Sequence, residues 1–243
     1  MFIINKVCSR LWMLRSLPKS VYFNFKYLPF CQAVKLPIIL YKPKLLKMAG
    51  EVILDVPRGR VKFGMIKLGN IMVSLYPNSG IVYENHGGRI IFKGRCSIGN
   101  SSALSVGKKA EVIFGDRFCA STSFRLTSYC GIEFKDKVSC GWDCLFMDTD
   151  FHRLTMADGS ASPKGYGKIQ IGKGCWFGTG TIVQKNTYLP PYCVVAVRSV
   201  LNHKYDIPEK SLVAGSPAVL KKTGVYRDID NDVIDYSDML RLS

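Results

Sequence analysis

The chain has 243 residues, 47% of them hydrophobic, and carries a formal net charge of +16. This length allows a sizeable core, whereas no stretch approaches the roughly 20 apolar residues that a membrane-spanning helix requires. The nine cysteines are odd in number, form no CxxC pair and follow no convincing secretory signal. These features argue against a disulfide framework and against a metal site, and they predict a protein of the reducing cytoplasm.

The basic residues are concentrated at the beginning of the chain. Up to Asn70 there are thirteen Lys and Arg against two acidic residues, so this part holds +11 of the total charge. Such an excess favours an anionic partner. No nucleic-acid-binding motif is present, however, and we expect no nucleic-acid partner.

The first 20 residues, MFIINKVCSRLWMLRSLPKS, mix apolar and basic side chains at near-helical spacing. This segment is suited to lie on the inner face of a membrane, with Lys6, Arg10 and Arg15 near anionic headgroups. The alternative is that it docks on the protein itself or on a neighbouring subunit. Residues 21–44 contain aromatics and prolines that predict extended segments and turns rather than one long helix. We assign 1–66 to this basic, aromatic N-terminal region.

Farther along the chain, an apolar residue recurs at every sixth position. The rows are Phe92, Ile98, Leu104 and Ala110; Phe114, Ala120, Leu126, Ile132, Val138 and Cys144; Val112, Phe118, Phe124 and Cys130; and Ile171, Phe177, Val183, Leu189 and Val195. A six-residue period predicts one short strand and one tight corner per unit, with three units per coil and the apolar rows stacked inside. The predicted fold is therefore all-β, a parallel β-helix that we assign to 67–222.

Two segments depart from this period. Cys144 and Ile171 are 27 residues apart, which is not a multiple of six, so the phase is broken between them. Gly, Ser, Pro and Asp in 153–168 predict an excursion loop, and long loops of this kind often carry function. Residues 223–243 contain five aspartates and are predicted to form a short, exposed acidic tail.

Two motifs resemble those of a known family. IGKGCWFGTG, followed by DIP and AGSPA, resembles the signature of the hexapeptide-repeat acyltransferases, whose fold is a left-handed β-helix. The segment DTDFH at 148–152 resembles the catalytic-histidine motif of the sugar and polysaccharide O-acetyltransferase branch. The resemblance covers about 90–222. It implies a homotrimer, acetyl-CoA bound in the cleft between neighbouring β-helices, and a saccharide acceptor.

His152 is the general base that this resemblance implies. Histidine suits the role because its unperturbed pKa is ~6.5. The imidazole would take a proton from an acceptor hydroxyl, which then attacks the thioester of acetyl-CoA directly. Asp148 and Asp150 are both candidates to orient the ring, and all three residues lie on one side if the strand continues that far. His86 and His203 are not expected to be catalytic.

The resemblance assigns the other site residues by their position in the motifs. They are Trp176, Gly178 and Thr179 along the pantetheine channel, Ala196 and Val197 farther along it, Lys221 and Lys222 near the CoA phosphates, and Ser121 and Ser123 where the galactoside enzyme has substrate-contacting asparagines. Arg198 departs from the family pattern, which has glycine at this position.

The predicted function is acetyl-CoA-dependent O-acetylation of a saccharide in surface polysaccharide or glycolipid biosynthesis. Two alternatives stay open: N-acylation of a nucleotide-linked amino sugar, and a non-catalytic β-helix scaffold. A γ-type carbonic anhydrase is excluded because it requires three histidine ligands on adjacent coils, and the stretch of six-residue rows, 92–195, contains only His152.

Overall fold

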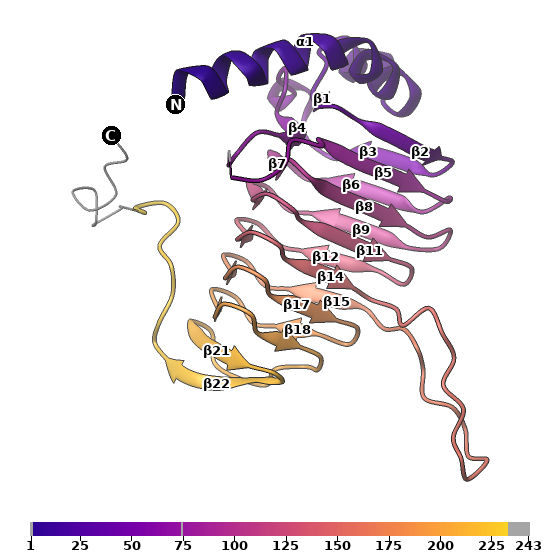
Figure 1. Cartoon of the computed structure of the whole chain (residues 1–243), viewed down its shortest axis with the longest axis vertical. Coiled ribbons are helices and arrows are strands. Elements are labelled where there is room, and N and C mark those ends of the chain that lie inside the picture. The colour runs from indigo at the N-terminus through magenta and orange to yellow at the C-terminus, as the bar shows by residue number, and fades with distance from the viewer. Residues whose placement is uncertain (1, 74, 233–243) are drawn as a thin grey trace.

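Three sheets, parallel except for the last pair β21–β22, wrap around a common interior to form a β-helix (Figure 1). The computed structural model describes residues 2–73 and 75–232, with side chains from Leu11 onward. Sheet A contains β1 (Ile38–Leu40), β4 (Ile66–Asn70), β7 (Cys96–Gly99), β10 (Phe118–Ala120), β13 (Ser139–Cys140), β16 (Trp176–Phe177), β19 (Val194–Val195), β21 (Ser211–Gly215) and β22 (Ala218–Thr223). Sheet B contains β2 (Lys44–Met48), β5 (Ile81–Asn85), β8 (Ser102–Val106), β11 (Arg125–Ser128), β14 (Leu145–Met147), β17 (Ile182–Gln184) and β20 (Val200–Leu201). Sheet C contains β3 (Glu51–Leu54), β6 (Arg89–Phe92), β9 (Glu111–Phe114), β12 (Ile132–Phe134), β15 (Ile169–Ile171) and β18 (Tyr188–Leu189).

The chain visits the sheets in the order A, B, C, so three consecutive strands make one coil. The predicted apolar rows point into the interior: Phe114, Ala120, Leu126 and Ile132 belong to four consecutive strands, and each is at most 1% exposed. The row that begins at Ile171 is equally buried. Of the predicted interior residues, Cys130 is the exception, because it lies half-buried at a corner. The parallel β-helix predicted from the six-residue period is confirmed.

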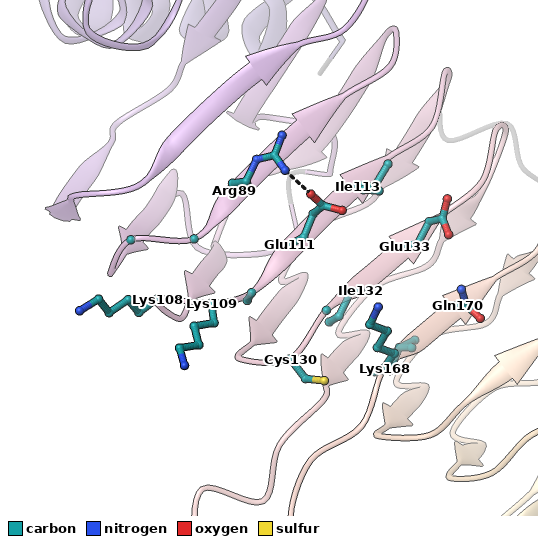
Figure 2. A pocket seen from close by; sticks show the side chains of 15 residues that line it. Arg89, Lys108, Lys109, Glu111, Ile113, Cys130, Ile132, Glu133, Lys168 and Gln170 are labelled. Atoms are coloured by element: carbon teal, nitrogen blue, oxygen red, sulfur yellow. Dashed lines mark hydrogen bonds and ion pairs between the residues drawn. The ribbon is translucent and has the colours of Figure 1, made fainter.

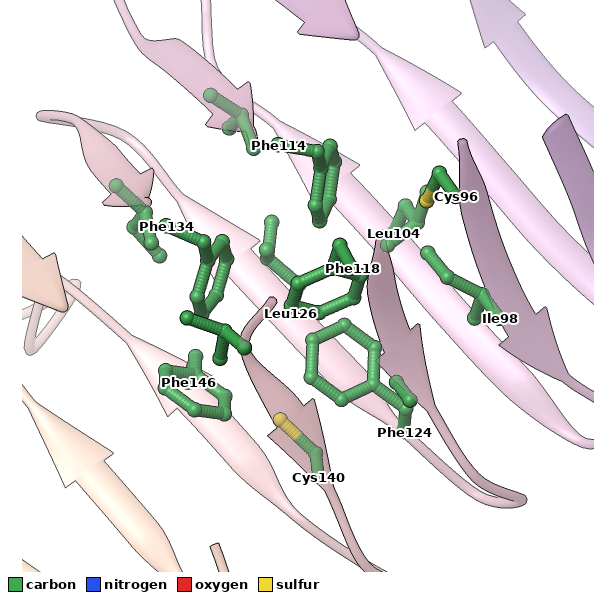
Figure 3. Close-up of a cluster of buried hydrophobic side chains, with 14 of the residues drawn as sticks. Cys96, Ile98, Leu104, Phe114, Phe118, Phe124, Leu126, Phe134, Cys140 and Phe146 are labelled. Atoms are coloured by element: carbon green, nitrogen blue, oxygen red, sulfur yellow. The ribbon is translucent and has the colours of Figure 1, made fainter. Parts of the chain in front are cut away.

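Aromatic rings fill the interior of the middle coils (Figure 3). Phe92, Phe114 and Phe134 are register partners in sheet C. Their rings stack with centroids 5.3 and 5.5 Å apart. Offset or stacked aromatic pairs contribute about 0.5–1.5 kcal/mol beyond the area that they bury. Because each ring belongs to a different coil, these contacts join neighbouring coils directly.

The β-helix begins earlier in the chain than the sequence period indicates. β1 pairs with β4, β2 with β5, and β3 with β6, all in parallel. The first coil therefore starts at Ile38, inside the region 1–66 that we assigned to the N-terminal extension. A short 3-10 helix, η1 (Arg58–Arg60), lies in the connection to the second coil.

Two helices precede this coil, α1 (Phe2–Tyr27) and the short α2 (Phe30–Ala33). α1 lies across the N-terminal end of the β-helix (Figure 1). The expectation of extended structure for 21–44 is wrong for 21–27, which continue α1, and for 30–33, which form α2. Local propensity did not reveal this, because the helix is held by tertiary contacts that include the buried Phe23 and Asn24. No helix in the described part of the chain is long and apolar enough to cross a membrane.

Three polar side chains on one face of α1 bond to the open edge of the first coil. The amide of Asn24 donates to Ile38 O at 2.7 Å and accepts from Ile38 N at 3.1 Å. Ser20 Oγ accepts from Leu40 N, and Ser16 Oγ accepts from Lys42 N, both at 3.0 Å. An edge strand with unpaired backbone groups is a template for aggregation. Because these residues are four positions apart, each turn of α1 supplies one partner to the backbone of β1 and of Lys42 just beyond it. These bonds satisfy the open edge.

The other end is finished differently. β22 turns back antiparallel to β21, and the chain then returns along the outside (Figure 1). The described part of the acidic tail is fastened by ion pairs. Asp230 bonds to Arg117 and Lys137 of the coils, both at 2.5 Å, and within the tail Asp232 pairs with Arg227. The tail is thus exposed, as expected, but it is attached to the coils.

Candidate active site

The residues predicted to form the site lie at two sets of corners that flank sheet B. We call the turns between sheets A and B the AB corners, and those between sheets B and C the BC corners. The predicted donor and acceptor residues Ser121, Ser123, Gly178, Thr179, Ala196 and Val197 lie at AB corners. His152 and both aspartates lie at a BC corner. Within one chain, the structure therefore assembles two groups and keeps sheet B between them.

The AB corners stack closely on one another. A Cβ at Gly178 would lie 2.7 Å from Val197 N in the next coil. This distance leaves no room for a side chain, so a packing requirement explains the glycine. Arg198 follows Val197 with φ of 53°, at the corner position where Gly180 has φ of 71° in the preceding coil. The departure from the family pattern thus places a non-glycine residue in a left-handed conformation.

Asp148 is fully buried at the BC corner and holds the turn of the coil before it. Its carboxylate accepts from Ser128 Oγ at 2.8 Å. It also accepts from three successive backbone N–H groups, those of Tyr129, Cys130 and Gly131, at 2.7, 3.0 and 2.6 Å. One carboxylate thus satisfies four donors of the turn, so these hydrogen bonds of Asp148 stabilise the fold. None of them is with His152.

The excursion loop begins at Asp148, since β14 ends at Met147. Thr149 forms an antiparallel bridge with Tyr166, which closes the base of the loop. Phe151 has φ of 60°, so regular strand geometry does not reach His152. Residues 148, 150 and 152 consequently do not form the alternating set that a continuing strand would give.

Asp150 and His152 occupy the exposed base of this loop. The carboxylate of Asp150 pairs with Lys185 Nζ, and its backbone N–H donates to Gly165 O at 2.7 Å. His152 is exposed, and its backbone N–H donates to the backbone carbonyl of Asp150 at 2.7 Å. The imidazole is therefore accessible to a substrate, and Asp150 lies two residues before it with a carboxylate at the surface.

Trp176, in β16, is 37% exposed. The guanidinium of Arg227, from the tail, lies 5.1 Å from its ring centroid. Lys221 and Lys222 are exposed on β22, at the end of the β-helix. Trp176 thus lies in the strand that leads directly into the AB corner of Gly178. Neither lysine forms an ion pair with another described residue.

A groove of about 450 Å³ runs from the BC corners onto the outer face of sheet C (Figure 2). Its cationic lining includes Lys108, Lys109 and Lys168, and Arg89 pairs with Glu111 at 2.9 Å. Lys168 is at the base of the loop that carries His152. Burial raises the pKa of the Cys130 thiol at the same groove, and the charge of Asp148 adds to this effect.

Sequence reasoning missed two residues that contact the segment just before His152. The rings of Tyr129 and Phe151 lie 5.0 Å apart, and Lys185 pairs with Asp150. Tyr129 comes from the coil before that of His152, and Lys185 comes from the coil after it. A per-coil alignment of the corners would have predicted this proximity, because residues at equivalent positions stack along the β-helix.

No family model matches the chain. It is 28% identical over 233 residues to an uncharacterized 24.8 kDa protein in the cps region of Klebsiella pneumoniae, covering 92% of this chain and 98% of that protein. Among solved structures, the polySia specific acetyltransferase NeuO is similar with a TM-score of 0.60 and 15% identity, over 81% of this chain and 76% of that chain. The polysialic acid O-acetyltransferase OatWY aligns with a TM-score of 0.37 and 16% identity, over 82% and 94% of the two chains.

The likeness to NeuO concerns the fold. It confirms the left-handed β-helix of hexapeptide repeats, and with it the resemblance to the hexapeptide-repeat acetyltransferases at the level of the fold.

Proposed function

We propose that the protein is an acyltransferase that transfers an acetyl group from acetyl-CoA to a saccharide hydroxyl, with His152 as the general base. The observation that carries this proposal is the placement of His152. It is an exposed histidine at the base of a loop that leaves the β-helix, and the loop is anchored through Asp148 and Asp150. Exposed groups on a loop held by a rigid scaffold are typical of catalytic sites.

In the proposed reaction, the imidazole of His152 accepts the proton of the acceptor hydroxyl. The hydroxyl oxygen bonds to the acyl carbon, the carbon–sulfur bond breaks, and the imidazolium returns the proton to the departing thiolate. General-base catalysis of this kind contributes about 10²–10⁴-fold. Asp150 is the better of the two aspartates to support the imidazolium. It lies two residues before the histidine with a partly exposed side chain that pairs with Lys185, whereas Asp148 is buried against the preceding turn.

The AB corners support the donor side of the proposal. The stack of Gly178, Thr179 and Ala196 presents backbone and small side chains, and the exposed Val197 continues it. Such a surface fits a narrow pantetheine chain, beside the ring of Trp176. Lys221 and Lys222 would supply positive charge to the phosphates.

We further propose that the site is completed by a second copy of the chain. His152 and the AB corner stack flank opposite sides of sheet B, so one subunit cannot place both around one substrate. A homotrimer of parallel β-helices would bring the BC corner of one subunit against the AB corner of the next.

The acceptor is proposed to be a saccharide of surface polysaccharide or glycolipid biosynthesis, modified in the cytoplasm at the inner face of a membrane. The groove in Figure 2 supports a polyhydroxylated acceptor, since its lining mixes cations with Glu111, Glu133 and Gln170. The relative in a cps region and the polySia specificity of NeuO support the same class. An amino-sugar acceptor would use the same base and give an amide.

Thiol release from acetyl-CoA, measured against a panel of hydroxyl and amino saccharides, tests this function. We expect release that depends on a hydroxyl saccharide and yields an alkali-labile ester. An alkali-stable amide product would favour the N-acyl alternative. If the protein neither binds acetyl-CoA nor releases thiol with any acceptor, the scaffold function replaces the proposal.

A further inference from the structure

We propose that the outward face of α1 docks on a bilayer surface that contains anionic lipids. This face, which we call the docking face, consists of Leu11, Leu14, Tyr22 and Phe25 of α1 with Phe30 and Val34 just beyond it. Each of these side chains is 47–74% exposed. Large apolar side chains gathered on one surface mark a binding site.

The polarity of α1 is the reverse of that of an ordinary surface helix. Its polar residues Ser16, Ser20 and Asn24 face the protein and are at most 5% exposed. An amphipathic helix in a soluble protein normally turns its apolar stripe to the core. Here, the bonds to β1 use the polar face, so the apolar residues at 11, 14, 22 and 25 are left together on the opposite side.

The charge around the docking face identifies the occupant. Arg15, Lys19 and Lys26 are exposed beside the apolar residues, and the first fifty residues contain no acidic residue. No ion pair among the described residues involves a side chain before Glu51. An apolar stripe flanked by cations is complementary to headgroups and acyl chains of an anionic bilayer. A second copy of the chain would bring these cations against one another.

Docking through α1 also fixes the orientation of the β-helix. α1 lies across the first coil, at the opposite end from β22 (Figure 1). The coils therefore stack away from the membrane. His152 follows β14, four strands beyond β2 in sheet B. Four strand spacings of about 4.8 Å place its corner roughly 19 Å below the first coil. If the proposed function holds, a lipid-linked acceptor must carry a glycan that spans this distance.

Co-sedimentation with vesicles tests the proposal and needs no acyl donor. The full chain is mixed with phosphatidylcholine vesicles, with or without phosphatidylglycerol, at low and high salt. We expect sedimentation with the anionic vesicles and weaker binding at high salt. The double variant Y22S/F25S should bind at least about 10-fold more weakly, because it loses two insertable rings. The variant R15E/K26E should bind at least about 30-fold more weakly, because attraction of the cations is lost.

Two matched controls separate this surface from general effects. K93E/K173E changes the net charge equally at two exposed corners between sheets C and A, and V219S removes an exposed apolar residue of β22. Both should bind as the wild type does, with thermal melting showing that every variant folds. Equal binding to neutral vesicles, or unchanged binding of both docking-face variants, would overturn the proposal. The proposal would also be overturned if the wild type does not bind vesicles and the docking-face variants lose self-association. That result would make the docking face a contact between subunits. Acetyl transfer is measured in a separate assay. Failure of the docking proposal can therefore be told apart from failure of the proposed function.

Discussion

The carboxylate of Asp148 accepts a hydrogen bond from the backbone N–H of Gly131 at 2.6 Å, which ties the first residue of the excursion loop to the turn of the preceding coil. Asp148 also bonds to two further N–H groups of this turn and to a serine hydroxyl. The DTDFH motif thus contains a structural aspartate and, two residues on, an aspartate at the surface. Mutation of the first is predicted to lower stability, whereas mutation of the second is predicted to lower kcat.

Asp148→Asn should destabilise the protein. The amide cannot replace a carboxylate that accepts four hydrogen bonds, so donors of the turn lose their partner. We expect the free energy of unfolding to fall by about 2–3 kcal/mol. Chemical denaturation monitored by circular dichroism measures the change. A stability equal to that of the wild type would show that the turn does not depend on this carboxylate.

Asp150→Asn should reduce kcat with little loss of stability. The side chains of Asp150 and Lys185 are 36% and 25% exposed, and an ion pair that solvent still reaches contributes little to folding. The matched variant Lys185→Met removes the same pair and leaves the carboxylate. If Asp150 supports the imidazolium, D150N should lower kcat more than K185M does, at similar KM for the acceptor. Equal kcat in wild type and D150N would exclude this positioning role.

Gly178→Ala should destabilise the AB corner. Its added Cβ would lie 2.7 Å from Val197 N and 3.0 Å from the carbonyl carbon of Ala196, so neighbouring coils must separate. We expect a loss of about 1–3 kcal/mol. Gly59→Ala is the matched control, because its Cβ meets nothing within 4 Å. Similar melting temperatures for both variants would contradict the packing explanation.

Asn24→Ala should expose the edge of the first coil. It removes both bonds to the backbone of Ile38, and buried groups left without partners cost about 1–3 kcal/mol each. We expect lower stability and a greater tendency to aggregate, measured by denaturation and light scattering. The exposed Asn231→Ala is the control. An unchanged Asn24→Ala protein would show that α1 is not needed to cover β1.

The attachment of the tail should depend on pH. Bonds from Lys137 and Arg117 hold the pKa of Asp230 below its usual range, and Arg227 does the same for the pKa of Asp232. Lowered values mean that the contacts contribute fully above the ordinary carboxyl pKa of about 3.9 and are lost as the pH falls through the lowered values. Hydrogen exchange of 224–232, corrected for intrinsic rates, should be slower at pH 7 than at a pH below the lowered values. The variant D230N should already exchange faster at pH 7.

The interior of the fold was predictable because a single apolar residue recurs at every sixth position of the sequence. Phe114, Phe177 and Leu189 are buried where the period places them. The first coil was not predictable in this way, since the connection that contains η1 separates it from the second coil, and Ile38 and its register partner Ile66 are not a multiple of six residues apart. The near-helical spacing of the first 20 residues indicated a helix there, but not its continuation to Tyr27, which depends on contacts of the buried Phe23 and Asn24. For the site, the sequence indicated His152, but it could not choose between the aspartates. That choice depends on bonds between Asp148 and residues seventeen to twenty positions away.

The central claim is that His152 removes the proton of an acceptor hydroxyl. The most direct measurement is kcat for saccharide-dependent thiol release by wild type, His152→Ala and the control His203→Ala, all shown to be folded. We predict a fall of about 10²–10⁴-fold in kcat for His152→Ala and no comparable loss for His203→Ala. Equal kcat in wild type and His152→Ala would contradict the account and place the base elsewhere.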